Sequence, residues 1–436
     1  MNNMIDDQTR KLQIAGRYRS ESRFRMVGAA ALAISAIFLA FLVLDILVKA
    51  LPAFHENSVI MNVLVDPARV DAANPKSGDF EGIIKDAMRD EFPNVNDRAD
   101  KKKLVKLLST GAADELRGQV VADPSLIGKQ VATRALLSAD ADMYAKGYFG
   151  TAKISKDANG LDVVTASIPE SNRQITDKEV IWLESLKARG LIDSSLAWRF
   201  FQAGDSREPE LSGMKGAIFG SLMTVFIALI ISLPLGVAAA IYLEEFAAKN
   251  RWTQFLEVNI NNLAAVPSII FGLLGLAIFL NVLGLPRSTP VVGGLVLALL
   301  VLPTIIIASR AAVRAVPPSI KEAALGVGAS RQQAVFHHVL PLALPGILTG
   351  TILGVARALG ETAPLLMIGM VAFIADVPTS VTSAATTLPV QIFLWSDLPE
   401  LAFQSRTSAA IIILLVLLFA LNGVAIYLRK RFEQRW

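Results

Sequence analysis

The sequence predicts an all-α polytopic membrane protein with six spanning helices and a soluble α+β insert after the first. Of its 436 residues, 53% are hydrophobic and 18% are charged, whereas about a quarter of the residues in soluble domains are charged. Six stretches also reach the roughly 20 mainly apolar residues that a spanning helix needs. They cover approximately residues 26–48, 217–243, 263–283, 291–308, 346–374 and 409–428.

The first span, residues 26–48, is expected to remain in the chain as an anchor. Its apolar core is too long for a signal peptide, and no small-residue cleavage site follows it. Asp45 lies one helical turn before Lys49, which favours an ion pair at the membrane interface over a relay.

Lysine and arginine residues near the span ends predict the orientation of the chain. The N-terminal tail, the loops after the second and fourth spans and the C-terminus are rich in them, whereas the other two short loops offer only Arg287 and Arg406. Because basic loops face the cytoplasm, both termini are expected there. The expected parts are a basic tail with the first span, an extracytoplasmic insert and a five-helix core, at 1–50, 51–210 and 211–436.

The insert is predicted to combine helices with a small sheet. Helical patterns run over 103–108, 125–137 and 176–187. The last begins with Thr176-x-x-Glu179, a capping box, and strand-like runs cover 59–65 and 162–168 with a turn at Asn159-Gly160. The chain has no cysteine and three histidines, and no G-x-S-x-G or H-E-x-x-H motif occurs. A spacer or docking surface is therefore favoured over a catalytic role, and no metal site is expected.

A polar stretch, residues 315–345, separates the fourth and fifth spans and contains two helix starts. Ser319-x-x-Glu322 and Ser330-x-x-Gln333 are both capping boxes. Between them, Gly326 and Gly328 can adopt the positive φ that ends a helix and reverses the chain. The sequence therefore predicts a helical hairpin held against one face of the membrane.

The fifth span carries two charges. Pro341 and Pro345 are expected to end the preceding helix, which places Arg357 about 17 Å into a span that starts near residue 346. A charge at that depth costs roughly 3 kcal/mol unless it is paired or hydrated, and Glu361 is one turn further on. The pair either fixes the helix register or lies on a water-filled path, where Arg357 attracts an anion and Glu361 moderates its charge. The second interpretation is favoured, because ionisable groups inside membranes commonly mark transport routes.

One side of this span carries a small residue at every fourth position. Such stripes let another helix approach closely. The residues are Gly346, Gly350, Gly354 and Ala358.

The hairpin resembles the coupling loop of ABC importer permeases. The resemblance rests on the ordered residues Glu322, Ala323, Ala324, Gly328, Leu340 and Pro341, with His338 where that family usually has isoleucine. It implies that the loop docks into a separate ATP-binding subunit. Because the sequence has no G-x-x-x-x-G-K-[ST] motif, ATP and Mg are expected on that partner chain, and no cofactor is expected here.

Two further motifs narrow the resemblance to PstA-type permeases of phosphate importers. They are Ala356–Pro364, which includes Arg357 and Glu361, and Ala265–Leu273. The resemblance covers residues 212–436 and implies a MetI-like core, a PstC-type permease partner, two PstB-type ATP-binding subunits and a PstS-type phosphate-binding protein. It also implies that Arg357 and Glu361 belong to the phosphate path.

The fourth span departs from this family. Relatives often have an arginine and then an acidic residue where this chain has Ile307 and Arg310, so no charge there is assigned to phosphate. Arg310 and Arg314 are instead expected to anchor the membrane boundary. The insert resembles, more vaguely, an extended N-terminal region of some family members, and contact with the binding protein or the partner permease is expected of it.

The function expected from these features is that of a phosphate permease subunit and not an enzyme. Two alternatives stay open. The cargo could be another oxyanion, sulfate or molybdate, or the chain could be a membrane-anchored sensor, although six spans and a docking loop exceed what a sensor needs.

Overall fold

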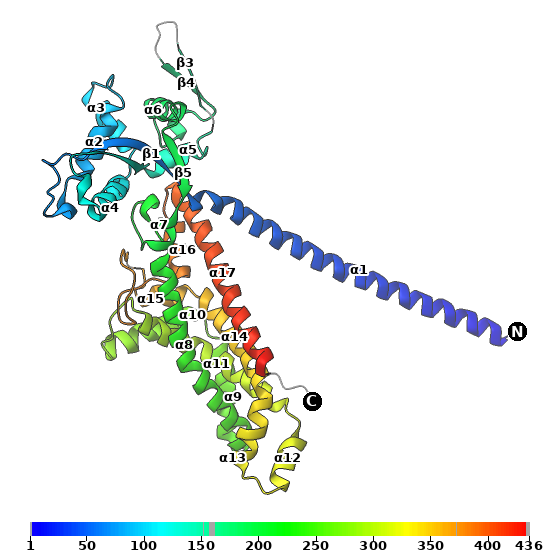
Figure 1. Cartoon of the computed structure of the whole chain (residues 1–436). Coiled ribbons are helices and arrows are strands. Elements are labelled where there is room, and N and C mark those ends of the chain that lie inside the picture. Colours follow the sequence, from blue (N-terminus) through cyan, green and yellow to red (C-terminus); the bar gives the residue numbers. More distant parts are fainter. Residues whose placement is uncertain (1, 151, 157–161, 372, 433–436) are drawn as a thin grey trace.

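The computed structural model describes residues 2–150, 152–156, 162–371 and 373–432. A mixed α+β domain lies at one end of a helical bundle, and the long helix α1 projects sideways from their junction (Figure 1). We call this end of the bundle the insert end, and the opposite end, where α12 and α13 lie, the loop end.

In the part of the chain that the structure describes, five helical segments are long and apolar enough to cross a membrane. They involve α1 Asn2–Ala50, α8 Lys215–Ile241, α11 Pro290–Arg314, α14 Leu340–Gly360 and α17 Leu401–Phe432. Two π-helical turns extend them: Tyr242–Phe246 continues α8, and Val335–Val339 joins α13 Arg331–Ala334 to α14. α11 packs against both α8 and α14, and α17 lies along α14 and contacts α1. The short helix α16 Leu388–Ser396 packs against α17 near the insert end.

The third predicted span is formed by a bent pair of helices instead of one helix. Its residues form α10 Ser268–Gly275 with a π-helical turn to Val282, and α9 Arg251–Ala264 meets this segment at a bend of 101°. Pro267 accounts for the break, because proline has no N–H to donate and disfavours helical backbone in the residue before it. The described residues thus hold six candidate spans when this bent pair is counted as one, as the sequence predicts.

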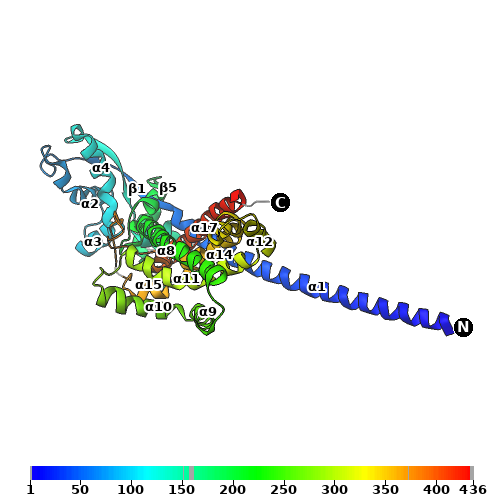
Figure 2. The same cartoon turned by 90° about the horizontal axis from the view of Figure 1, so that it is seen from below.

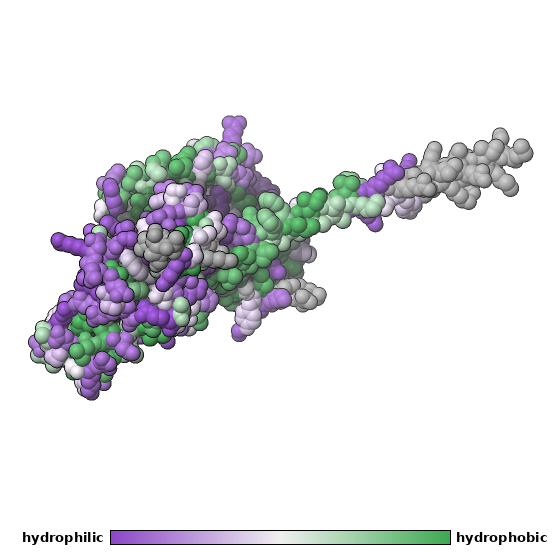
Figure 3. All heavy atoms as spheres, turned by 90° about the horizontal axis from the view of Figure 1, so that it is seen from above, coloured by the Kyte–Doolittle hydropathy of each residue, from purple (hydrophilic) through white to green (hydrophobic). Residues whose placement is uncertain are grey.

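Helix α1 stands clear of the bundle along most of its length (Figure 2). Its large apolar side chains, such as Phe24 and Phe38, are exposed, and apolar surface covers the part of the helix nearer the bundle (Figure 3). The predicted ion pair is present, with Lys49 Nζ 2.7 Å from Asp45 Oδ2. An apolar helix that the bundle leaves uncovered suits a lipid environment.

The insert is built on an antiparallel sheet with strand order β2–β1–β5, and the expected α+β class is confirmed. The strands are β1 His55–Leu64, β2 Gln130–Leu136 and β5 Ile192–Leu196. A separate hairpin pairs β3 Ala152–Lys156 with β4 Asp162–Ala166. The helices are α2 Phe80–Asp90, α3 Arg98–Lys106, α4 Asp114–Ala122, α5 Ala139–Ala145, α6 Asp177–Ala188 and α7 Trp198–Gln202.

The helix predicted over residues 125–137 is wrong, because this stretch contains strand β2. Val131, Thr133 and Ala135 are buried in alternation with exposed neighbours, and this period of two outweighs the helical pattern. Other predictions are confirmed, namely the strands near 59–65 and 162–168 and the capping box Thr176-x-x-Glu179. The turn predicted at Asn159-Gly160 lies outside the described residues.

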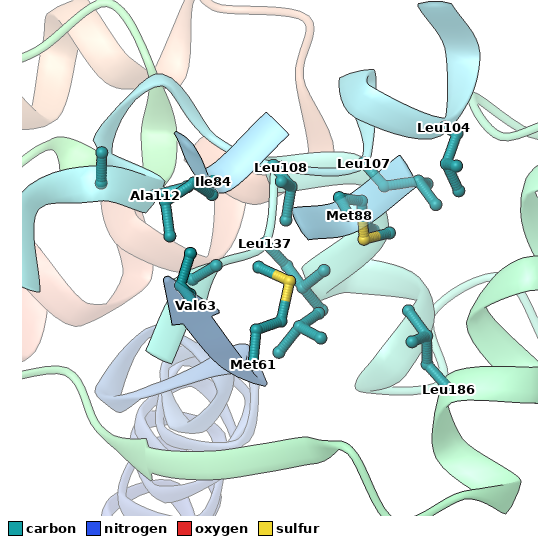
Figure 4. Packing of buried hydrophobic residues seen from close by; sticks show 14 of the residues in the cluster. Met61, Val63, Ile84, Met88, Leu104, Leu107, Leu108, Ala112, Leu137 and Leu186 are labelled. Atoms are coloured by element: carbon teal, nitrogen blue, oxygen red, sulfur yellow. The ribbon is translucent and has the colours of Figure 1, made fainter. Parts of the chain in front are cut away.

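The hydrophobic core of the insert lies between the sheet and its helices (Figure 4). Met61 of β1 and Met88 of α2 are among its fully buried members. Leu401 and Ala402, the first residues of α17, pack into the same core. Burial of each large apolar side chain contributes roughly 1.5–3 kcal/mol. The insert is therefore packed onto the end of a spanning helix rather than attached by a loose linker.

A buried arginine joins the insert to the bundle. Arg406 of α17 is 6% exposed and donates hydrogen bonds to the backbone carbonyl oxygens of Ser212, at 2.6 Å, and Glu210, at 3.3 Å. Its guanidinium carbon lies 5.2 Å from the ring centroid of Phe200 in α7. Since residues 210–212 lead from the insert into α8, Arg406 holds the insert and the insert ends of α8 and α17 together.

Two carboxyl groups lie close to this junction, the buried Glu210 and the half-buried Glu56. Burial raises the pKa of Glu210 above the usual range, and its neighbours Glu208 and Arg406 act in opposite directions. Burial also raises the pKa of Glu56, against the opposing effect of Arg199 and Arg406. A carboxyl group with a raised folded-state pKa stabilises the fold fully below its unfolded pKa, and this contribution is lost as the pH rises through the folded pKa.

Glu210→Gln should therefore raise the melting temperature of the solubilised protein at neutral pH and weaken its dependence on pH. The wild-type melting temperature should rise as the pH falls from neutrality to about 5, where these groups gain protons before global acid effects dominate. Thermal unfolding in detergent across this range measures both effects. Glu115→Gln, at an exposed position on α4, is the matched control, and equal pH profiles for the two variants would contradict the expectation.

Candidate functional site

The charged pair predicted in the fifth span lies where its helix breaks. α14 ends at Gly360, and Glu361 has extended backbone with φ −80° and ψ 122°. Pro364 explains the break, because its ring would collide with the Gly360 carbonyl group and its nitrogen has no hydrogen to donate. Arg357 nevertheless reaches the carboxylate, with its Nε 3.5 Å from Glu361 Oε1. The ion pair is present, but the prediction of one continuous span as far as residue 374 is wrong.

The Arg357–Glu361 pair is only partly covered by the chain. The side chain of Arg357 is 37% exposed and that of Glu361 is 18% exposed. At 3.5 Å the contact is longer than the 2.7–2.9 Å of a strong charge-assisted hydrogen bond. Arg357 therefore keeps hydrogen-bonding capacity for another anion.

The two motifs that narrowed the family resemblance pack against each other. Gly272 of α10 faces Pro364 in the first turn of α15 Ala363–Met367, and a Cβ added to Gly272 would lie 2.7 Å from the Pro364 Cα. Only glycine permits this approach. Two interrupted helices thus meet beside the charged pair. Broken helices inside a membrane occur where protein or a water-filled cavity satisfies the freed backbone groups.

The small-residue stripe of α14 packs against α11. A Cβ added to Gly346 would lie 2.6 Å from the Cβ of Ala312, and Gly350 meets Ala308 in the same way. Gly354 follows against Ile305 and Val301. The stripe therefore fixes the side of α14 that faces α11, as small residues do in other membrane helix pairs.

The predicted hairpin forms the loop end of the bundle. α12 Pro318–Gly326 is followed by Gly328, whose φ is +93°, a value that side-chain-bearing residues rarely adopt. α13 begins with the predicted capping box: Ser330 N donates to Gln333 Oε1 at 2.9 Å, and Gln333 N donates to Ser330 Oγ at 3.3 Å. Gly326, in contrast, ends the helix without a positive φ.

Most of the predicted coupling residues are accessible on this hairpin. Glu322 and Ala323 are exposed, Ala324 is buried, and Leu340 and Pro341 are half-buried at the start of α14. Apolar side chains are exposed beside them, with Val327 at 87% and Leu325 at 41%. A mixed polar and apolar tip of this kind is typical of a protein contact surface.

Two predicted details of the hairpin are wrong. α12 begins at Pro318, so Ser319 lies inside the first turn and does not cap it. Pro341 and Pro345 do not end the second helix, which runs unbroken from Arg331 to Gly360. The π-helical turn before Pro341 changes the hydrogen-bond register, and proline is tolerated in the first turn that follows. Arg357 therefore lies about 39 Å from Arg331 along one helix.

Arg310, which was expected to anchor the membrane boundary, is paired with carboxylates inside the protein. Arg310 is 9% exposed, and its guanidinium contacts Glu244 and Glu257, each at 2.7 Å. Arg314 shares Glu244 at 2.9 Å, with a side chain that is 69% exposed. Sequence reasoning missed these carboxylates. The available signal was the acidic pair Glu244-Glu245, which ends an apolar span and faces a basic loop.

Together these features define a class of protein. A polytopic helical core has a charged pair at a helix break, and a rigid exposed hairpin at one end offers another protein a contact surface. This arrangement suits a membrane transport subunit that is moved by a partner.

Comparison with known proteins agrees with this class. A family model described as "Binding-protein-dependent transport system inner membrane component" matches residues 232–435, and a "Domain of unknown function (DUF3333)" matches residues 11–154. The "Probable ABC transporter permease protein YqgI" of Bacillus subtilis is 31% identical over 278 residues, which cover 57% of this chain and 94% of the relative. The "Phosphate transport system permease protein PstA" of Yersinia pestis is 32% identical over 256 residues, which cover 58% and 85%.

A solved chain of the inward-facing MetNI methionine ABC transporter is 18% identical, with a TM-score of 0.42, and the match covers 51% of this chain and 96% of that chain. The protein belongs to the family of ABC transporter permeases, in which it has PstA relatives, and the predicted MetI-like core is confirmed. It is therefore a multi-pass inner-membrane transport subunit.

Proposed function

We propose that this chain forms half of the translocation path of an ATP-driven phosphate importer. The observation that carries the proposal is the Arg357–Glu361 pair at the break between α14 and α15. A half-exposed guanidinium offers the planar donor geometry that suits a phosphate oxyanion, and the carboxylate beside it prevents the anion from being held too tightly. The PstA relatives support phosphate as the cargo.

The hairpin between α11 and α14 is proposed to dock into an ATP-binding subunit. Glu322, Ala323 and Val327 are its exposed contacts, and Gly328 fixes the turn that presents them. The complete assembly would contain a PstC-type permease, two PstB-type subunits that bind ATP and Mg, and a PstS-type binding protein. In this arrangement the hairpin and both termini face the cytoplasm, and the insert lies on the opposite side.

Reconstitution tests this function directly. The chain is assembled in proteoliposomes with its partner permease, the ATP-binding subunits and the phosphate-binding protein, and uptake of radiolabelled phosphate is measured with and without ATP. We expect ATP-dependent uptake that excess sulfate or molybdate does not reduce. Uptake of sulfate or molybdate in place of phosphate would assign the alternative cargo, and an assembly that transports none of them would favour the sensor.

Gly328→Pro should reduce co-purification of the ATP-binding subunit by about tenfold, because proline cannot adopt a φ of +93° and the strain is worth roughly 1–3 kcal/mol. Glu322→Lys should also weaken docking while leaving the turn intact. Gly326→Ala is the matched control, since open space surrounds Gly326 and its φ is not positive. Normal docking by both test variants would remove the coupling role from this hairpin.

A further inference from the structure

The loop end of α8 carries two consecutive carboxylates, Glu244 and Glu245, on the π-helical turn Tyr242–Phe246. Consecutive residues of a helical turn point about 100° apart, so the two side chains reach different neighbours. Glu244 pairs with Arg310 and Arg314 of α11, and Glu245 pairs with Lys321 of α12. We call Glu244 and Glu245 the acidic clasp.

The Glu244 side of the clasp is largely shielded from water. The side chains of Glu244 and Arg310 are 14% and 11% exposed, and Arg310 also binds Glu257 of α9. Ion pairs with this little exposure are weakly screened by salt, and removal of one member leaves an uncompensated charge. Through Arg310, the clasp ties the ends of α8, α9 and α11 together.

The Glu245 side of the clasp holds both helices of the hairpin. Lys321 of α12 pairs with the Glu245 carboxylate, and the guanidinium of Arg331, at the start of α13, donates a hydrogen bond to the Glu245 backbone carbonyl oxygen. Arg331 also lies over the ring of Phe246, 5.4 Å from its centroid. A displacement of either hairpin helix therefore pulls on the same turn of α8.

Apolar packing and a polar cavity both border the clasp. An apolar cluster that includes Ile241, Val335 and Ile347 packs against Phe246 of the turn. A polar cavity of about 600 Å³ is lined by Glu244, Glu245, Lys321 and residues of α9. Close packing resists displacement, whereas an open polar cavity leaves room for it. Lys321 can therefore shift relative to Glu245 while the packed residues of the turn stay in place.

We propose that the acidic clasp transmits movement of the hairpin to α8, α9 and α11, with Glu245 as the positioning residue that couples the hairpin to the spans. This inference rests on the proposed function, because it assumes that an ATP-binding subunit moves the hairpin. Ion pairs carry the coupling at both ends of the clasp, with Lys321 at the hairpin and with Arg310 at the spans.

A charge-swap experiment tests the clasp in the reconstituted assembly with inorganic phosphate as cargo. Glu245→Lys and Lys321→Glu should each lower the phosphate transported per ATP hydrolysed by about fivefold or more, while the ATP-binding subunit still co-purifies. The double variant restores the opposite charges and should recover most of the loss. Lys249→Glu lines the same cavity, makes the same charge change as Lys321→Glu and should leave the ratio unchanged.

Each outcome separates the clasp from the proposed function. If the wild-type assembly moves phosphate and the single variants transport as much phosphate per ATP as the wild type, the coupling role of the clasp is contradicted. The proposed function as a phosphate permease is then unaffected. A double variant no better than the singles would also contradict the coupling role. If the wild-type assembly moves no phosphate at all, the proposed function fails first.

Discussion

Arg406→Met should lower the melting temperature of the solubilised chain by about 10 °C, the largest stability loss we expect from any single substitution. The guanidinium donates to the carbonyl oxygens of Ser212 and Glu210. It also interacts electrostatically with the buried Asp142 and the half-buried Glu56. Methionine fills similar space but donates no hydrogen bond. Breaking a buried charged network by removing one member costs roughly 3–5 kcal/mol, since its partners remain buried.

The readouts for Arg406 are thermal unfolding and limited proteolysis of residues 203–214. Arg431→Met removes the same charge from an exposed position near the other end of α17 and should change little. Arg406→Lys keeps a charge but loses the two-pronged donor geometry, so an intermediate loss is expected. A melting temperature for Arg406→Met equal to that of Arg431→Met would mean that the insert is held by its apolar core alone.

The parts of the fold that the sequence predicted correctly depend on local patterns. Residues close together in the sequence are enough to identify the apolar runs, the strand at 59–65 and the capping boxes at Thr176 and Ser330. The order of residues between Glu322 and Pro341 likewise identified the hairpin before any contact was known. Local signals of this kind persist in the structure because tertiary packing agrees with them.

The predictions that failed concern residues whose contacts are with residues distant in the sequence. Arg406 was counted only as a loop residue, yet its partners lie about two hundred positions earlier. Arg310 depends on carboxylates of α8 and α9, and no spacing within α11 reveals them. At Pro341 a π-helical turn preserved the helix, whereas at Pro364 the helix broke. Proline sets a local constraint, and the surrounding structure decides how the chain satisfies it.

Arg357→Gln should reduce phosphate uptake by roughly tenfold to a hundredfold while the assembly stays intact. A hydrogen bond from a charged group contributes roughly 1.5–3 kcal/mol, and each 1.4 kcal/mol corresponds to a tenfold change. Loss of the guanidinium removes the attraction for the anion without adding bulk. Uptake into proteoliposomes is the measurement, with co-purification of the ATP-binding subunit as the check on assembly. Arg287→Gln, at an exposed site between the spans, controls for the lost charge.

Glu361 distinguishes a transport role for this pair from a structural one. If the ion pair only fixes the end of α14, Glu361→Gln should disturb uptake as much as Arg357→Gln does, since either change breaks the same contact. If Arg357 binds the passing anion, Glu361→Gln leaves it unneutralised, so phosphate should bind more tightly and leave more slowly. The apparent KM would then fall together with the maximal rate, whereas Arg357→Gln would raise KM. Opposite shifts in KM from two substitutions in one ion pair cannot come from the loss of the contact alone.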